Sequence, residues 1–186
     1  MGREQQQPTL WRTCRVLANR TRLQILQLLL HQPGQSVSSL ATQLKLGLPA
    51  ASQYLRALEA RGLLRLRRNG RKVVYRVHTT TSDTPVPTLV RSLRLTFLRD
   101  ARPIDTIYRL ATAFTHPRRI ELFRALNAGP QSFDLLVAAT HIPRDALLRH
   151  LHKLVARGFV IRQSGHYALA ERKDDLGQEL TRLAIG

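Results

Sequence analysis

The sequence of 186 residues is poor in several residue types, and each shortage excludes a class of protein. Cysteine occurs once, as Cys14, so a scaffold held by internal disulfides is excluded. Only 12 residues are acidic, against 30 lysines and arginines, and the formal net charge is +18. A chain this basic repels itself and attracts polyanions. The alternative is that the solvated arginines serve only to keep the protein soluble.

Long apolar runs are absent as well. The richest apolar stretch, residues 25–30, contains a glutamine and is followed by His31, which is far short of the roughly 20 residues that span a bilayer. The first residues contain no apolar signal core, so we expect residues 1–9 to form a short disordered tail. The apolar fraction of 43% is nevertheless high enough for a packed core, which makes intrinsic disorder of the whole chain a poor interpretation.

Motifs for catalysis and metal binding are also missing. The sequence has no glycine-rich phosphate loop, no nucleophile elbow and no arrangement of paired carboxylates, so we predict that it is not an enzyme and needs no cofactor. None of the spacings among its histidines matches a structural zinc site; they lie at positions 31, 78, 116, 141, 150, 152 and 166. Cys14 lies among apolar residues and is predicted to be part of the core.

Self-similarity divides the chain into two copies. At a shift of 96 positions, residues 40–55 align without a gap on residues 136–151, and Gly62 falls on Gly158. The apolar pattern agrees although identity is low, so we predict two domains, at residues 10–100 and 101–186. A segment rich in threonine and proline, residues 79–87, is predicted to be a loop between them.

The positive charge is concentrated in the first copy. Residues 1–78 contain 14 basic and 2 acidic residues, whereas residues 101–186 contain 13 basic and 8 acidic ones. We therefore expect the first half to do most of the binding to a polyanion.

Each copy is predicted to consist of helices followed by one hairpin. In the first copy, a first helix is expected at residues 10–18 and a second helix begins after the capping residue Asn19. A third helix is expected at 37–44, a fourth begins after a turn at Gly47, and a last one covers 88–98. Leu48, Ala51, Leu55 and Leu58 are predicted as the buried stripe of the fourth helix. Two strands joined at Asn69-Gly70 follow that helix. In the second copy, a first helix is expected at 104–115, and a second helix begins at His116 and Pro117. Further helices are expected at 133–139, 144–156 and 176–185. A hairpin over 159–169 is expected to turn near Ser164-Gly165.

This order of elements predicts the fold class. A short helix, a tight turn, a second helix and a two-stranded hairpin form a winged helix-turn-helix. We therefore predict a mainly α protein with small β-hairpin wings, built as two tandem winged helix-turn-helix domains. Such domains bind double-stranded DNA, with the second helix of the motif in the major groove.

The candidate DNA-binding residues follow from this placement. On the reading helix of the first copy the outward residues include Ala50, Ser52, Gln53 and Arg56, which can meet base edges or phosphates or can be ordinary exposed residues. The wing carries a run of cations expected to contact phosphates and the minor groove: Arg65, Arg67, Arg68, Arg71, Lys72 and Arg76. Arg20 and Arg22 flank a helix start, where they can hold a phosphate or serve as structural caps.

The reading helix of the second copy is less suited to DNA. Leu148 stands where the first copy has Ser52, and Asp145 where it has Pro49. Its candidates for phosphate contact are Arg144, Arg149, His152 and Lys153. We expect this copy to supply mainly packing surface and non-specific charge.

The first copy resembles a known family. Residues 17–26 (LANRTRLQIL) resemble the opening of the ArsR-type winged-helix repressors, residues 40–55 resemble their helix-turn-helix, and residues 57–77 resemble their helix end and wing. The second copy is similar more weakly, through residues 116–119 and 147–151. The resemblance implies a DNA-binding transcriptional regulator, here a repressor, and implies dimers formed through the first and last helices of each domain.

Two departures from the family pattern are present. The cysteines, histidines and carboxylates with which founding members sense metals have no counterparts in residues 36–44 or 88–98, so we expect no metal site. The duplication is the second departure, and it predicts an internal pseudo-dimer of the two domains, with further homodimerisation possible. The alternatives are an architectural or replication-type DNA binder of low specificity and a protein-binding module. A DNA binder of this kind is expected in the cytoplasm, associated with the nucleoid.

Overall fold

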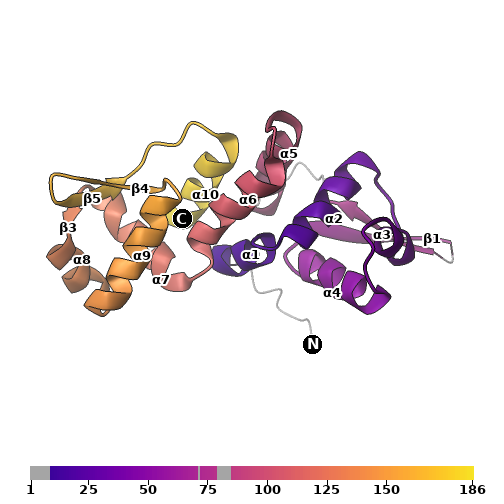
Figure 1. The fold of residues 1–186 in the computed structure, drawn as a ribbon, viewed down its shortest axis with the longest axis horizontal. Helices are drawn as coiled ribbons and strands as arrows, with labels where there is room; N and C mark the ends of the chain where they lie inside the picture. Colours follow the sequence, from indigo (N-terminus) through magenta and orange to yellow (C-terminus); the bar gives the residue numbers. More distant parts are fainter. Residues whose placement is uncertain (1–8, 71, 79–84) are drawn as a thin grey trace.

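A computed structural model of the chain describes residues 9–70, 72–78 and 85–186, leaving out the side chains of Asn69, Lys72 and Pro85 (Figure 1). The first half contains α1 (Leu10–Leu17), α2 (Arg20–His31), α3 (Val37–Gln43), α4 (Leu48–Glu59), β1 (Leu64–Asn69), β2 (Lys72–Val77) and α5 (Pro85–Arg99). The second half contains α6 (Pro103–Ala111), the 3-10 turn η1 (Thr112–Phe114), α7 (Pro117–Ala125), the 3-10 turn η2 (Leu126–Ala128), β3 (Gln131–Ser132), α8 (Phe133–Thr140), α9 (Arg144–Ala156), β4 (Val160–Gln163), β5 (His166–Leu169) and α10 (Asp175–Ile185).

Helix starts follow the caps that the sequence predicts. The side-chain oxygen of Asn19 accepts a hydrogen bond from the backbone N–H of Arg22 at 3.0 Å, which confirms Asn19 as the cap of α2. Nδ1 of His116 accepts from the backbone N–H of Arg118 at 3.1 Å, and Pro117 is the first residue of α7, as predicted.

The turn between α3 and α4 ends at Gly47, as predicted, but Gly47 is not its left-handed residue. Gly47 has an ordinary φ of −67° and precedes α4, whereas Lys45 takes the left-handed conformation at φ 53°. Leu48 was predicted to be buried, and this is wrong, because its side chain is 56% exposed. Leu46, half-buried, packs against the core just before the helix, so the chain turns outward before Leu48 and leaves it at the helix N-terminus.

The two hairpins are antiparallel and short. In the first, Asn69 pairs with Lys72 and Gly70 has a φ of 60°, so β1 extends one residue beyond its predicted end. In the second, β4 and β5 turn through Ser164 and Gly165, as predicted. The short strand β3, which joins the edge of β5, was not predicted because two residues leave no alternating pattern in the sequence.

A glycine follows α4 in the first half and α9 in the second. Gly62 and Gly158, which the predicted repeat aligns, have φ values of 70° and 72°. Other residues rarely adopt this conformation, so both positions require glycine. A Cβ atom at Gly62 would also lie 3.1 Å from Cγ1 of Val86 on α5.

One connected apolar core runs through both halves. Cys14 is completely buried within it, which confirms its predicted core position, and burial raises the pKa of its thiol. In the second half, Phe114 packs edge-to-face against Phe123 and Phe159, with ring centroids 5.1 and 4.8 Å apart.

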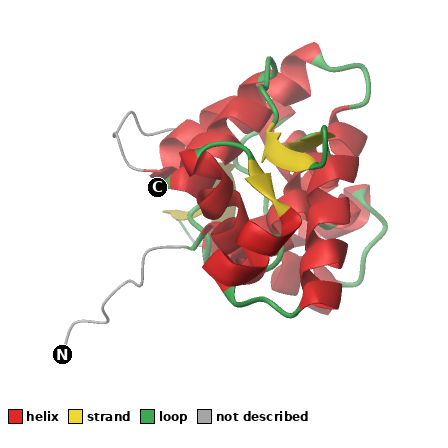
Figure 2. Cartoon of the chain, turned by 90° about the vertical axis from the view of Figure 1, so that its left-hand side faces the viewer, coloured by secondary structure: helices red, strands yellow, loops and turns green. Residues whose placement is uncertain are grey.

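Helices at the ends of each half connect the halves to each other. α1 packs on α6 and η1, α6 packs on α2 and α5, and α5 packs on α10. Hydrogen bonds connect α5 and α10, since Thr88 Oγ1 donates to Glu179 at 2.6 Å and Nη2 of Arg182 donates to Thr88 Oγ1 at 3.1 Å. Figure 2 shows that helices form most of the protein and that the strands between them are short. None of the helices in the described ranges is long and apolar enough to cross a membrane.

Candidate nucleic-acid interface

The face that α4 turns away from the core is polar. Ala51, Leu55 and Leu58 are fully buried and fix the orientation of the helix. Gln53 and Arg56 are exposed on the opposite side, while Ala50 and Ser52 are half-buried at its margin. The helix therefore presents the predicted reading residues together on one surface, as a helix in a major groove requires.

Ser52 and Arg56 are connected by hydrogen bonds. Nη2 of Arg56 donates to Oγ of Ser52 at 2.9 Å, and Nε donates to the same atom at 3.3 Å. Because Ser52 lies one turn earlier on α4, these bonds direct the guanidinium toward the N-terminal part of the helix. That part of a recognition helix usually meets base edges.

The wing distributes its arginines over both faces of the hairpin. Arg65 and Arg67 alternate with Leu66 and Arg68 along β1, and Arg76 pairs with Arg65 across the strands. The alternation of a strand therefore places Arg65, Arg67 and Arg76 on one face and Arg68 on the other. All four side chains are exposed. Of the other predicted wing cations, Arg71 and the side chain of Lys72 lie outside the described residues.

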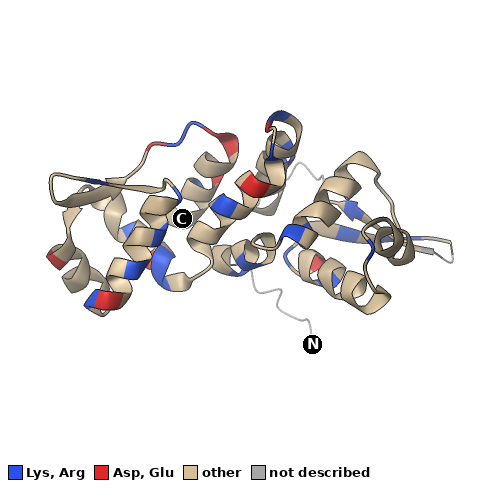
Figure 3. Ribbon diagram, in the orientation of Figure 1, with Lys and Arg blue, Asp and Glu red and all other residues tan. Residues whose placement is uncertain are grey.

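The surroundings of this surface are almost free of negative charge. Within residues 9–78 the only acidic residue is Glu59, at the C-terminal end of α4. In Figure 3 most acidic segments lie elsewhere, near the end of α5, near the starts of α6 and α10, and on α8 and α9. The potential near α4 and β1 is therefore positive, which attracts a phosphate backbone.

Arg20 and Arg22 make contacts within the protein. Arg20 forms an ion pair with Asp105 of α6 and lies over the ring of Tyr108, with its guanidinium carbon 5.1 Å from the ring centroid. Nη1 of Arg22 donates to the carbonyl of Val16 at 3.3 Å, which caps the end of α1. Of the two readings that the sequence left open, these contacts favour structural caps and pairing partners.

Helix α9, which the sequence predicted as the reading helix of a second copy, presents a different surface. Arg144 is paired with Asp134 at 2.7 Å, and Leu148 is 40% exposed. Arg149 is exposed, whereas Lys153 is half-buried. Burial lowers the pKa of Lys153, and the nearby guanidinium of Arg157 lowers it further. The face therefore mixes apolar, acidic and basic groups, which suits a DNA groove poorly.

Two exposed residues beside the α4 surface, Lys45 and Leu48, were not predicted to lie there. Leu48 was assigned to the core by its helical spacing, and Lys45 is exposed in the turn before α4. The position of Lys45 in the turn was the available signal, because a helix-turn-helix presents this turn beside the reading helix. No signal in the spacing distinguishes Leu48 from the truly buried positions.

Histidine placement gives no metal centre in the described chain. The rings of His116 and His150 lie side by side, tilted by 38°, with centroids 4.8 Å apart. Nevertheless, among the residues that the structure describes, no group of three or more His, Cys, Asp or Glu side chains is placed to hold a metal ion. Burial lowers the pKa of His150 to about 4, with contributions from His116, Arg119, Arg149 and Arg118.

Comparison with known proteins supports a function for the first half. Residues 19–65 match the family model described as bacterial regulatory protein, arsR family. No curated protein and no solved structure matches the sequence at a significant level. The matched region contains α2, α3 and α4 and reaches the start of the wing. Residues 19–65 therefore form a helix-turn-helix domain of the arsR family, which implies that the chain is a DNA-binding transcriptional regulator.

Proposed function

We propose that this protein is a sequence-specific repressor whose first half reads DNA, with α4 in the major groove and the arginine wing on the backbone. The observation that carries the proposal is the surface made by Ser52, Gln53 and Arg56 on α4, next to a basic wing and free of acidic residues apart from Glu59. Arginine can bond guanine in a bidentate manner, and serine and glutamine can meet other base edges.

The second half is proposed to be a diverged winged helix-turn-helix that takes the place of a partner subunit. Its elements from α6 to α10 follow the same order as α1 to α5, apart from the 3-10 turns and β3. Its outer helices cover α1 and α5 of the first half. In this arrangement the surfaces through which ordinary family members pair would already be occupied inside one chain.

A monomer built this way would read an asymmetric site. Two equal reading heads demand a palindromic operator, because operator symmetry mirrors protein symmetry. Here α9 offers Asp145, Leu148 and a paired Arg144 in place of the polar surface of α4. We therefore expect base-specific contacts in one major groove and only phosphate contacts in the next.

The experiment that tests the proposal is selection of bound sites from random duplexes, followed by footprinting and by measurement of mass in solution. The expected result is one enriched, non-palindromic motif bound by one chain, at least a thousandfold more tightly than a scrambled duplex, as is typical of specific binding. Equal affinity for both duplexes would favour the architectural, low-specificity alternative. A palindromic motif bound by two chains would contradict the internal pseudo-dimer while leaving the DNA-binding role of α4 in place.

A further inference from the structure

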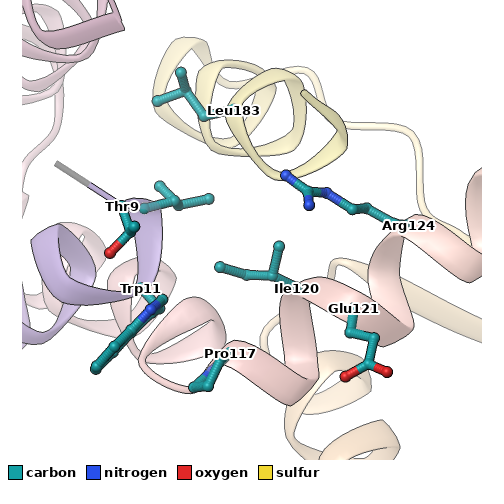
Figure 4. Close-up of a pocket in the computed structure, with 8 residues that line it drawn as sticks. Thr9, Trp11, Pro117, Ile120, Glu121, Arg124 and Leu183 are labelled. Atoms are coloured by element: carbon teal, nitrogen blue, oxygen red, sulfur yellow. The ribbon is translucent and has the colours of Figure 1, made fainter. Parts of the chain in front are cut away.

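A hollow of about 470 Å³ lies where the first helix of one half meets the other half. Its walls come from both halves: Leu10 and Trp11 from α1, Ile120 and Arg124 from α7, and Leu183 from α10. Figure 4 shows Ile120 between Trp11 on one side and Arg124 on the other, with Leu183 on the opposite helix. The volume falls in the usual range for small-molecule sites.

The lining combines apolar side chains with a single free positive charge. Ile120 is nearly buried, and Leu10, Trp11 and Leu183 are half-buried. Nε of Arg124 donates to the carbonyl of Ala184 at 2.8 Å, which holds the guanidinium beside α10. Across the described ranges of the chain, no carboxylate lies within ion-pair distance of this guanidinium.

The neighbouring carboxylate does not neutralise Arg124. Glu121 borders the hollow but forms its ion pair with Arg118, at 3.5 Å. Figure 4 shows the Glu121 carboxylate directed away from Arg124. The charge available to a ligand inside the hollow is therefore that of Arg124.

We propose that this hollow is a binding site for a small amphipathic carboxylate, with its apolar or aromatic body on Trp11, Ile120 and Leu183 and its carboxylate on Arg124. Guanidinium and carboxylate form charge-assisted hydrogen bonds, and their specificity comes from the matching geometry of the two groups. Apolar contact with the walls supplies the remaining affinity. Because the ligand touches both halves and binds only the folded chain, it also raises the thermal stability of the chain.

The structure provides its own reporter, since Trp11 is the only tryptophan in the sequence. We would titrate the full chain with 3-phenylpropanoate while exciting Trp11, and repeat the titration with the uncharged 3-phenylpropanamide and with inorganic sulfate. The expected result is a saturable change in emission with the carboxylate, about tenfold weaker binding of the amide, and none with sulfate. The midpoint of thermal unfolding should rise with the carboxylate.

Two arginine variants separate the site from general charge. Arg124→Gln should weaken 3-phenylpropanoate about tenfold and leave the amide unchanged, whereas the control Arg149→Gln, which removes an exposed arginine outside the hollow, should change neither. Leu183→Gln should weaken both ligands. Equal effects of Arg124→Gln and Arg149→Gln, or equal affinity for acid and amide, would overturn the proposal.

Two further measurements, a titration after removal of residues 1–8 and a dilution series without ligand, distinguish two other occupants of the hollow. If 3-phenylpropanoate bound only after removal of residues 1–8, the site would belong to the chain's own N-terminal segment. If Trp11 emission changed with protein concentration alone, a second copy would fill the hollow. Either outcome, or no saturable emission change at all, would overturn the proposal of a small carboxylate.

Discussion

Arg20 of α2 is paired with Asp105 of α6, across the boundary between the two halves. The same guanidinium lies over the ring of Tyr108, one turn further along α6. Arg20 was a candidate for phosphate binding because it lies at a helix start. The structure instead places its guanidinium in contact with the other half of the chain. The contact of Arg20 with Asp105 and Tyr108 therefore links the first half to the second, and substitution of Arg20 tests its contribution to stability.

Arg20→Ala should affect stability more than DNA binding. Loss of the ion pair and the ring contact should lower the free energy of unfolding by about 1 kcal/mol, because both groups are substantially exposed. DNA affinity should change no more than in the control Arg99→Ala, which removes an ion pair with Asp175 elsewhere on the interface. Chemical denaturation and DNA titration measure the two effects. A DNA defect as large as that of Arg67→Ala would contradict this assignment.

Ser52 and Arg56 should act as one unit in base discrimination. Arg56→Ala should reduce the preference for the selected site over a scrambled duplex by about 1–3 kcal/mol if a base contact is lost. Ser52→Ala should reduce it less, and adding it to Arg56→Ala should have little further effect, since Ser52 orients the guanidinium. Titrations of the two single variants and the double variant give the coupling energy. Strictly additive losses would show that the hydrogen bond has no role in recognition.

Removal of wing charge should weaken binding to every duplex alike. Arg67→Ala combined with Arg68→Ala should flatten the dependence of log K on log salt by roughly one to two units, because each phosphate contact contributes about 0.9. If only one face of the hairpin meets DNA, the single variants will divide this loss unequally. The control is Arg149→Ala on α9, which should have a smaller effect than either. If Arg149→Ala proved the most damaging, the first half would not be the main reader.

Leu48 should contact a thymine methyl group at the edge of the site. Its side chain is 56% exposed at the first residue of α4, and apolar side chains recognise the C5-methyl of thymine in the major groove. Replacing individual thymines by uracil in the selected site should lower affinity at one position, by about 0.8 kcal/mol. Leu48→Ala should lose the same amount and become insensitive to that uracil. Unchanged sensitivity in Leu48→Ala would contradict the contact.

Stability should fall in mild acid because of His150. Its pKa is lowered to about 4 by burial and by neighbouring positive groups, whereas an unfolded histidine titrates near 6.5. The unfolded state therefore takes up the proton first, so the stability from neutral His150 is complete above pH 6.5 and is lost as the pH falls toward 4. We expect a loss of about 1 kcal/mol after solvent screening. His150→Gln should remove this part of the pH dependence in denaturation experiments, and an unchanged profile would contradict it.

Several features could be predicted from the sequence because they depend on local chemistry. Asn19 and His116 cap their helices through their own side chains, and glycine at positions 62 and 158 meets a left-handed backbone. The Ser164-Gly165 turn likewise follows from short-range preferences.

Other features were decided only by tertiary structure. Helical spacing made Leu48 equivalent to Ala51 and Leu55, but its burial depends on whether another element covers the first turn of α4, and none does among the described residues. The partner of Arg20 lies 85 residues away, so the helix start alone left phosphate and protein as equal choices. The composition determined that the net charge is positive and that the chain attracts polyanions. Long-range packing determined which arginines stay exposed to such a ligand and which are paired within the protein.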